Sequence, residues 1–359
     1  QGLPGTNGFP QVNNVSEQLL PDNFYDARIK TTMPLINPDI RINREIKQKE
    51  TQLAQNEIDA YKRELVKEIK TAYYNFLSAT KAISIFENAL TVVRQNLKVN
   101  QSLLNNGKGL YAYVSRAESE VSQVQAQLLT AMNEQRNAQA YFNFLLNRTL
   151  TDSVEVHNYT MDPSALQGLV AGDGNTMNKR EELKSLDLAR DINTGMLKLN
   201  RSFRLPRLHT FIDLGAQGFD FKVNDQSFFY LAGLQIQVPI FTGKRNLYKI
   251  EMAEIALKNL AVNTEYTQKQ LNLAAFVSRN NVINSYNNYL ASVKQQEASQ
   301  NYFKLIDRGY KEGINSFIEM LDARNQLTGS QLQVNINTYK YLSALADYER
   351  QTATYSFNK

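Results

Sequence analysis

A long internal repeat constrains the fold of this chain more than any other feature of its sequence. The stretch MPLIN, which contains Pro34, recurs as VPIFT around Pro239, an offset of 239 − 34 = 205 residues. Further along, Gly107 is echoed by Gly313, an offset of 313 − 107 = 206 residues. A repeat of this length is too long for a solenoid unit, so it predicts a duplicated architecture with internal twofold pseudo-symmetry.

The repeat divides the chain into three parts. We expect a first structural repeat at 1–150, a linker at 151–178 and a second repeat at 179–359. The first repeat contains a strand hairpin and a long helical hairpin. The second repeat has a leading helix, a strand hairpin at 208–242 and a long helical hairpin at 243–356.

Composition limits the classes of protein that fit. With 42% hydrophobic residues the 359-residue chain can bury a sizeable core, yet no run approaches the roughly 18 apolar residues of a spanning helix. The absence of Cys excludes disulfides and Cys-ligated metals. A net charge of +5 that is spread over both signs forms no basic block, so nucleic acid is not expected as a partner.

Heptad spacing predicts long coiled-coil helices. In the first half an apolar residue falls every seven positions, at Ile69, Phe76, Ile83, Leu90, Leu97 and Leu104. Asp39 to Leu104 would form one helix about 100 Å long at 1.5 Å per residue. After the break at 105–109 the apolar spacing resumes, and the same pattern surrounds Gly313. Each half is therefore predicted to carry a helical hairpin.

Alternation of apolar and polar residues predicts strands between the helical segments. It runs through Tyr25–Met33 in the first half and through Leu208–Phe221 and Tyr230–Ile240 in the second. Pro34 and Pro239 follow or end such stretches. Because proline cannot donate to a strand ladder, we expect these prolines to mark the corners where strand gives way to helix.

Two interpretations of the strands are open. They could form a half-buried sheet on a soluble domain, because alternation alone does not exclude it. The heptad helices, however, use their apolar stripes on one another and leave nothing to cover the apolar strand face. Strands of about ten residues with this alternation are the unit of a membrane barrel. Four strands per chain cannot close a barrel, so this interpretation requires an oligomer.

Several features together resemble the TolC-type outer-membrane efflux proteins. They are the duplicated strand-to-helix corner, the helix that starts REEL at Arg180 and leads into LPRL at Leu205, and the glycine-broken helical hairpins. The resemblance covers nearly the whole chain. It implies a mainly α fold whose helical hairpins form an α-barrel, with four strands per chain in one trimeric membrane β-barrel.

The resemblance also implies a function and partners. The protein would be the outer-membrane channel of a tripartite efflux or type I secretion system, extending into the periplasm and exporting passively. Its partners would be two further copies of the chain, a periplasmic adaptor (membrane fusion) protein, an inner-membrane pump of RND, ABC or MFS type and outer-membrane lipid. The substrate is not readable, because a passive duct takes its specificity from the pump.

One departure from the family pattern concerns the beginning of the chain. The leading helix at Lys179–Arg204, moved back by 205 residues, has its counterpart before residue 1, and the glycine-rich start Gln1–Pro10 is a poor strand. We therefore expect further sequence before Gln1, including a signal peptide, a first helix and any lipid-anchored Cys.

The hairpin tips are the expected site of a pore gate. By position relative to Gly313, the resemblance implies gate roles for Tyr310, Glu319 and Asp322. Three copies of the two carboxylates would form a negative constriction that favours cations. The structural alternative is that two carboxylates three residues apart simply make a solvated helix face.

Other gate positions differ from the family pattern. Tyr113 stands where the first repeat can carry an acidic residue, and Asn315 stands where a basic residue is expected. Closure by a salt bridge between helices is therefore doubtful. Tyr111, Tyr113 and Tyr310 could instead occlude the pore by packing, although tyrosines near a helix end are commonly ordinary seam residues.

The hairpin turns are expected to contact the adaptor. The residues concerned are Gly107, Lys108, Gly109 and Leu110 in the first turn and Gly313, Ile314, Asn315 and Ser316 in the second. As structure alone, the glycines would simply end one helix and allow the next to begin.

Catalysis finds no support in the sequence. The two histidines, His157 and His209, have no acidic cluster at ligand spacing, and Gly172-Asp173-Gly174 lacks the context of a nucleotide loop. No enzyme, metal or cofactor is expected. Two alternatives to a channel remain open: a periplasmic coiled-coil adaptor, and an extended scaffold protein without a pore.

Overall fold

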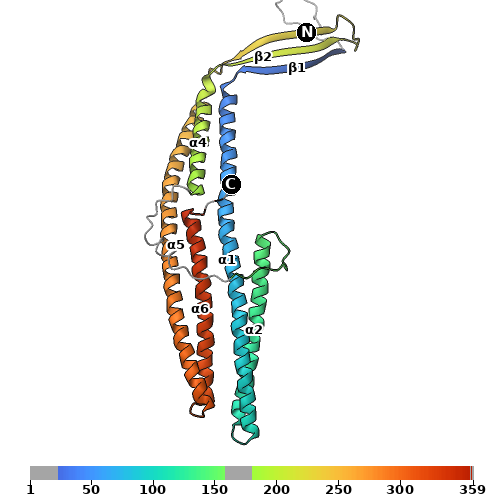
Figure 1. The fold of residues 1–359 in the computed structure, drawn as a ribbon. Coiled ribbons are helices and arrows are strands. Elements are labelled where there is room, and N and C mark those ends of the chain that lie inside the picture. The colour runs from blue at the N-terminus through green and yellow to red at the C-terminus, as the bar shows by residue number, and fades with distance from the viewer. Residues whose placement is uncertain (1–22, 158–179, 356, 358–359) are drawn as a thin grey trace, which may run out of the picture. The chain divides into compact units, whose positions relative to one another are not determined.

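The computed structural model describes residues 23–157, 180–355 and 357, and it is mostly helical (Figure 1). In chain order the elements are β1 (Phe24–Ile36), α1 (Pro38–Asn105), α2 (Tyr111–Leu145), α4 (Glu181–Arg201), the 3-10 turn η2 (Ser202–Arg204), β2 (Arg207–Phe219), β3 (Phe228–Gln237), α5 (Arg245–Lys311) and α6 (Phe317–Thr352). Most of the expected linker, including Gly172-Asp173-Gly174, and the residues before Asn23 lie outside the described part of the chain.

The chain forms two compact units. The first consists of the described residues up to Lys49 together with Asp191–Lys258, and it contains the strands. The second consists of the described residues within Glu50–Arg190 and Asn259–Lys359, and it contains most of both helical hairpins.

The strands form one antiparallel sheet in the order β1-β2-β3. The three segments whose alternation predicts strands do form strands, with ends that differ by one to three residues from those expected. The fourth expected strand, in the first half, is not among the described residues. Ile29 of β1 lies opposite Leu214 of β2, which in turn lies opposite Tyr230 of β3. Because directly paired residues point to the same face, this register aligns the apolar positions of all three strands.

The corner between strand and helix differs from the prediction in the first half. Pro34 lies inside β1, and the register shifts between Pro34 and Ile36, where the β1–β2 ladder is irregular. The helix α1 begins at Pro38, where the missing N–H of proline is harmless. The Asn37 side chain accepts a hydrogen bond of 3.1 Å from the backbone N–H of Asp39. The corner is therefore at Asn37–Pro38.

Pro239 also lies away from the last strand residue. β3 ends at Gln237, and α5 begins at Arg245. Pro239 is thus part of the connecting segment, whose turn uses Gly243 and Lys244 at positive φ values of 61° and 62°. The sheet ends earlier than the expected Ile240.

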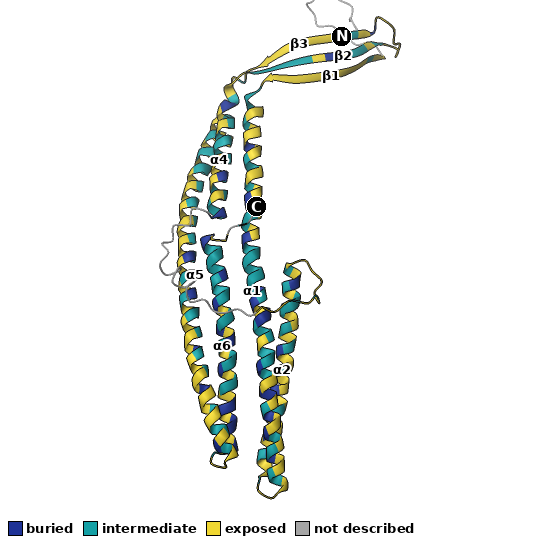
Figure 2. Cartoon of the chain, viewed as in Figure 1, coloured by how far each residue is buried: buried dark blue, intermediate teal, exposed yellow. Residues whose placement is uncertain are grey.

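One face of the sheet is apolar and uncovered by any described residue (Figure 2). Its larger side chains are between 49% and 84% exposed. They are Ile29, Met33, Ile212, Leu214, Tyr230, Leu234 and Ile236. Single exposed apolar residues are ordinary, but a continuous apolar face across three strands indicates a surface that meets something apolar.

The opposite face of the sheet is polar and internally paired. Arg28 forms an ion pair with Asp26, and Lys30 lies 5.6 Å from the centre of the Phe211 ring. Asp213, which is opposite Lys30 in the register, is buried. The two faces therefore differ: the charged side chains of the sheet lie on this face, among rings such as that of Phe211, and the other face carries none.

The helices of the second unit pack along the predicted stripes. Leu90 and Val93 of α1 pack against Val124 of α2. Phe76 and Leu77 of α1 belong to a second cluster, which also contains a residue of α6, Ala346. The expected helical hairpins are confirmed as α1–α2 and α5–α6, and buried positions recur along their helices in Figure 2.

The sequence predicts no membrane-spanning helix, and one described helix, α1, differs from that prediction. By length and composition alone, α1 contains a window apolar enough to cross a membrane. The apolar residues of α1 include Phe76 and Val93, which pack against other helices of the chain. Helices α2 and α6 thus cover part of the apolar surface of α1.

An ion-pair network joins three helices of the second unit. Glu182 accepts hydrogen bonds from Arg180 at 2.7 Å and from Arg350 at 2.9 Å, and Arg350 also donates to Glu64 at 2.6 Å. Burial acts to raise the pKa of Glu182, but the hydrogen bond from Arg180, a backbone hydrogen bond and the charges of Arg180 and Arg350 together outweigh it and lower that pKa to about 2.

This lowered pKa predicts an acid-dependent loss of stability. A depressed carboxyl pKa stabilises the fold above the unfolded value of 4.5, and the contribution is lost as pH falls from there towards about 2. At pH 7 we expect Glu182→Gln to destabilise the protein by about 1–3 kcal/mol, because charged hydrogen-bonding partners lose their acceptor. The difference from wild type should shrink through that acid window in thermal unfolding followed by circular dichroism.

Asp187→Asn is the matched control for Glu182→Gln. Asp187 is also on α4, but its ion pair with Arg190 is exposed, so its effect should stay within about 0.5 kcal/mol. A difference between wild type and Glu182→Gln that stays constant from pH 7 to pH 2 would contradict the assignment.

Candidate functional site

Both hairpin tips turn by the same backbone motif. Gly107 has a φ of 68° and Gly313 a φ of 76°, in the left-handed region that favours glycine. In the first turn Gly107 donates to the carbonyl of Leu104 at 3.0 Å, and Lys108 donates to the carbonyl of Leu103 at 2.9 Å. The same pair of bonds closes the second turn. This is the Schellman arrangement, so the glycines do end their helices.

Glu319 has a structural role at the start of α6. Its backbone N–H donates to the Ser316 hydroxyl at 3.3 Å, and its carboxylate accepts from the Ser316 backbone N–H at 2.7 Å. These reciprocal bonds form a capping box. The bond from the Ser316 backbone, and then that from its hydroxyl, lower the pKa of Glu319. The carboxylate is therefore ionised at neutral pH.

Asp322 lies one turn beyond Glu319 on the same helix. Both side chains are exposed, and Asp322 accepts a hydrogen bond of 2.8 Å from Gln326. Residues three apart are neighbours on a helix surface. The structure thus brings the two predicted gate carboxylates together on the exposed side of α6.

The two predicted gate tyrosines meet around a third aromatic residue. Tyr113 of α2 and Tyr310 of α5 both lie against Phe317 of α6, with ring centres 5.5 Å and 6.2 Å away. Phe317 is only 2% exposed. Heptad spacing does not single out Phe317, although its place directly after the helix-capping Ser316 is a readable signal. Tyr111, by contrast, is exposed and outside this cluster.

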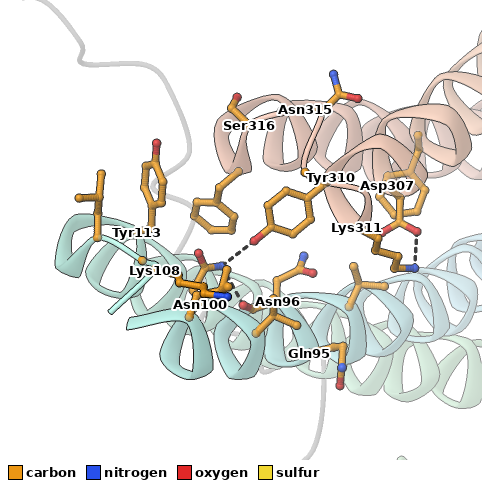
Figure 3. A pocket seen from close by; sticks show the side chains of 18 of the residues that line it. Gln95, Asn96, Asn100, Lys108, Tyr113, Asp307, Tyr310, Lys311, Asn315 and Ser316 are labelled. Atoms are coloured by element: carbon orange, nitrogen blue, oxygen red, sulfur yellow. Dashed lines mark hydrogen bonds and ion pairs between the residues drawn. The ribbon is translucent and has the colours of Figure 1, made fainter. Parts of the chain in front are cut away.

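Hydrogen bonds also connect the two hairpins near their tips (Figure 3). Asn100 of α1 donates to the Tyr310 hydroxyl at 3.2 Å, and buried Asn96 donates to the sulfur of Met320 at 3.2 Å. Burial raises the pKa of Tyr310, so its phenol stays neutral at physiological pH. Sequence periodicity did not identify these asparagines, because they are polar residues in a buried stripe.

A pocket of about 990 Å³ lies beside these contacts. Its apolar lining comes from all four tip helices and the first turn and includes Val92, Val99, Leu103, Leu110, Phe303 and Phe317. Lys311 and Asp307, 2.6 Å apart, form part of its polar lining, and Lys108 adds a further cation. The hairpins therefore enclose a largely apolar hollow near their tips.

The tip surface carries exposed apolar side chains. Leu110 and Ile314 are in the predicted contact turns, and Tyr111 and Ile318 lie just after them. Their exposures range from 53% to 76%. Clustered exposed apolar residues are typical of surfaces that bind another protein. Within the part of the chain that the structure describes, no group of three His, Asp or Glu residues could hold a metal ion.

The described geometry can be compared with known proteins. A model of the outer membrane efflux protein family matches residues 17–148 and 175–350, which is most of the chain. This chain belongs to the outer membrane efflux protein family. The resemblance inferred from the sequence and the localisation to the bacterial outer membrane are thereby confirmed.

Individual proteins that are similar to this chain are also outer-membrane proteins. The chain is 25% identical over 279 residues, 74% of its length, to the solvent efflux pump outer membrane protein SrpC of Pseudomonas putida, and it spans 57% of that relative's length. The Campylobacter jejuni CmeC outer membrane channel has a similar fold, with a TM-score of 0.78, 14% identity and coverage of 92% of this chain and 71% of that one. The Vibrio cholerae outer membrane protein VceC is also similar in fold, with a TM-score of 0.74 and 13% identity. The match covers 92% of this chain and 86% of VceC.

Proposed function

We propose that this protein is the outer-membrane channel of a tripartite efflux or type I secretion system. It passively conducts substrates from the periplasm or from an inner-membrane pump to the exterior. The observation that carries the proposal is the three-stranded sheet, whose apolar face is uncovered and whose opposite face is charged. This is the arrangement of a barrel wall between lipid and a watery interior.

Closing such a barrel requires further copies of the chain. The sheet has β1 and β3 at its edges, and an open edge does not persist in lipid. The helix α5 carries exposed apolar residues at heptad-like spacing, which are Met252, Ile255, Val262, Tyr266, Leu273 and Phe276. A seam of this kind needs a partner helix. Both features support a homotrimer with one shared β-barrel and one helical tunnel.

The internal repeat is part of the proposal. A strand followed by two long helices occurs in each half of the described chain, and the tip glycines share one turn motif. We assign 1–150 to the first repeat, 151–178 to the linker and 179–359 to the second repeat.

The gate is proposed at the hairpin tips. In a trimer, the exposed Glu319 and Asp322 would give a ring of carboxylates, which favours cations. Tyr113 joins the first hairpin to Phe317 of the second, and Tyr310 packs on Phe317 within the second hairpin. The exposed apolar residues of the two turns, Leu110 and Ile314, are the proposed contact for a periplasmic adaptor.

Single-channel recording in a planar bilayer tests the channel and the gate. The variant is Glu319→Gln with Asp322→Asn, because glutamine at the third helical position still completes a capping box while it removes the charge. We expect cation-selective currents from wild type, and in the variant a cation-to-anion permeability ratio that falls several-fold towards one.

Glu265→Gln with Glu297→Gln is the matched control, because it removes two exposed carboxylates of α5 that lie outside the tip. Its selectivity should equal that of wild type. Unchanged selectivity in the tip variant would remove Glu319 and Asp322 from the gate. Detergent-stable protein that conducts nothing would instead favour the adaptor or scaffold alternatives.

A further inference from the structure

A buried ion pair joins the two hairpins within the second unit. The Arg324 guanidinium of α6 lies 2.8 Å from the Glu120 carboxylate of α2, and each side chain is only 4% exposed. The second carboxylate oxygen of Glu120 is 2.8 Å from Arg116, one turn earlier on α2. The pair connects residues 204 positions apart in the sequence.

Stability alone does not account for this pair. Taking two charges out of water costs about as much as their attraction returns, so a buried pair contributes little net stability. Burial lowers the pKa of Arg324, and the Glu120 charge only partly opposes it. Losing either partner leaves an uncompensated buried charge. A pair of this kind instead favours one relative orientation of two helices over slightly rotated orientations in which the pair would be broken.

The packing changes at this pair. Towards the tip, Ala117 of α2 is in close contact with Phe317, Met320 and Leu321 of α6. Beside the pair lies a pocket of about 150 Å³, which Thr328 and other residues of α6 help to line. The pair therefore stands between a closely packed tip and a looser region.

The position of Arg324 bears on the direction of the gate carboxylates. At about 100° per residue, Asp322 is about 200° and Glu319 about 140° around the helix from Arg324. Arg324 is buried against α2, whereas Asp322 and Glu319 are exposed. A contact that holds Arg324 on α2 thus turns both carboxylates away from the neighbouring helix.

We propose that the Glu120–Arg324 pair sets the rotation of α6 about its axis and thereby directs Glu319 and Asp322 outward. Both partners are positioning residues, because both side chains are buried. The role as a gate support rests on the proposed function. The rotational setting itself does not, so the two can fail separately.

Cysteine accessibility tests the rotation, since the chain contains no Cys of its own. Asp322→Cys and Leu321→Cys are made singly, and their rates of modification by a charged, membrane-impermeant methanethiosulfonate are compared. Asp322 is exposed and Leu321 is 4% exposed, so the first variant should react much faster. With Glu120→Gln added to each, we expect the ratio of the two rates to fall by about tenfold, because the buried pair has lost one partner.

Rotation and unfolding give different patterns. Rotation slows the Asp322→Cys variant while it speeds the Leu321→Cys variant, whereas unfolding speeds both. Arg324→Lys is a milder second variant, which keeps the charge but loses the planar fork. Arg308→Gln, which breaks an exposed pair with Glu312 on α5, should leave the ratio unchanged.

Two outcomes would overturn the proposal. One is an unchanged rate ratio in both Glu120→Gln and Arg324→Lys, and the other is equal acceleration at both cysteine positions. If Glu120→Gln changes the rate ratio but the channel of the Glu120→Gln variant without added cysteine keeps wild-type ion selectivity, the rotational setting is upheld and its link to the gate is removed.

Discussion

Replacing Leu234 with arginine is expected to prevent stable insertion of the protein into the outer membrane. Leu234 is 68% exposed on the apolar face of the sheet, in the same row as Thr210 and Met33 of the neighbouring strands. An arginine at the midplane of a lipid-facing strand costs about 2–4 kcal/mol per copy. In a trimer this cost is incurred three times, which is comparable to the whole stability of an ordinary domain.

The neighbouring residue provides the control for this prediction. Gln235 follows Leu234 in β3 and points to the opposite, charged face of the sheet. Gln235→Arg should insert as wild type does and keep the heat-modifiable migration of a detergent-stable trimer. Leu234→Arg should lose that band and leave the membrane fraction. If both variants insert equally well, the apolar face is not in contact with lipid.

The sequence predicted the elements well because each has a local signal. The heptad through Phe76 and Leu90 gave the long helix α1 to within a residue or so of its ends. The alternation that ends near Met33 gave β1 and its two chemically different faces. Such periodicities depend only on which side of an element is buried, so they can be read from the sequence even when the partner element is unknown.

The corners and the tip contacts were less predictable. Pro34 marked a bulge inside β1 because β1 extends beyond the alternating segment. The contact of Phe317 with Tyr113 and the Glu120–Arg324 pair join segments about 200 residues apart, and a single sequence holds no local signal for such contacts. The cap of α6 by Ser316 was readable from the S-x-x-E spacing, but Glu319 had been considered only as a gate residue or a solvated one.

These differences share a physical cause. The predicted gate roles came from counting residues from Gly313, which locates a position along a helix but does not say what its side chain touches. The structure adds that Tyr310 is held by Asn100 and Phe317, so a role of Tyr310 in the proposed gate would act through the packing of the two hairpins. Glu319, which keeps its carboxylate exposed while it caps α6, can serve both purposes at once.

Phe317→Ala is expected to have the largest effect at the tip. Phe317 is 2% exposed and contacts the rings of Tyr113 on α2 and Tyr310 on α5. Truncating a buried phenylalanine to alanine costs about 3–5 kcal/mol through lost burial and the cavity that remains. Because the lost contact with Tyr113 joins the two hairpins, we expect the loss to appear as separation of the tips.

Two measurements separate a loosened tip from a failure to fold. Trimers of Phe317→Ala should still form, because the sheet and the seam of α5 are untouched, but their single-channel conductance should rise above that of wild type. Ile318→Ala is the matched control, since Ile318 is the next residue of α6 and is 53% exposed; its conductance should not change. Wild-type conductance in Phe317→Ala would mean that the aromatic cluster does not hold the gate.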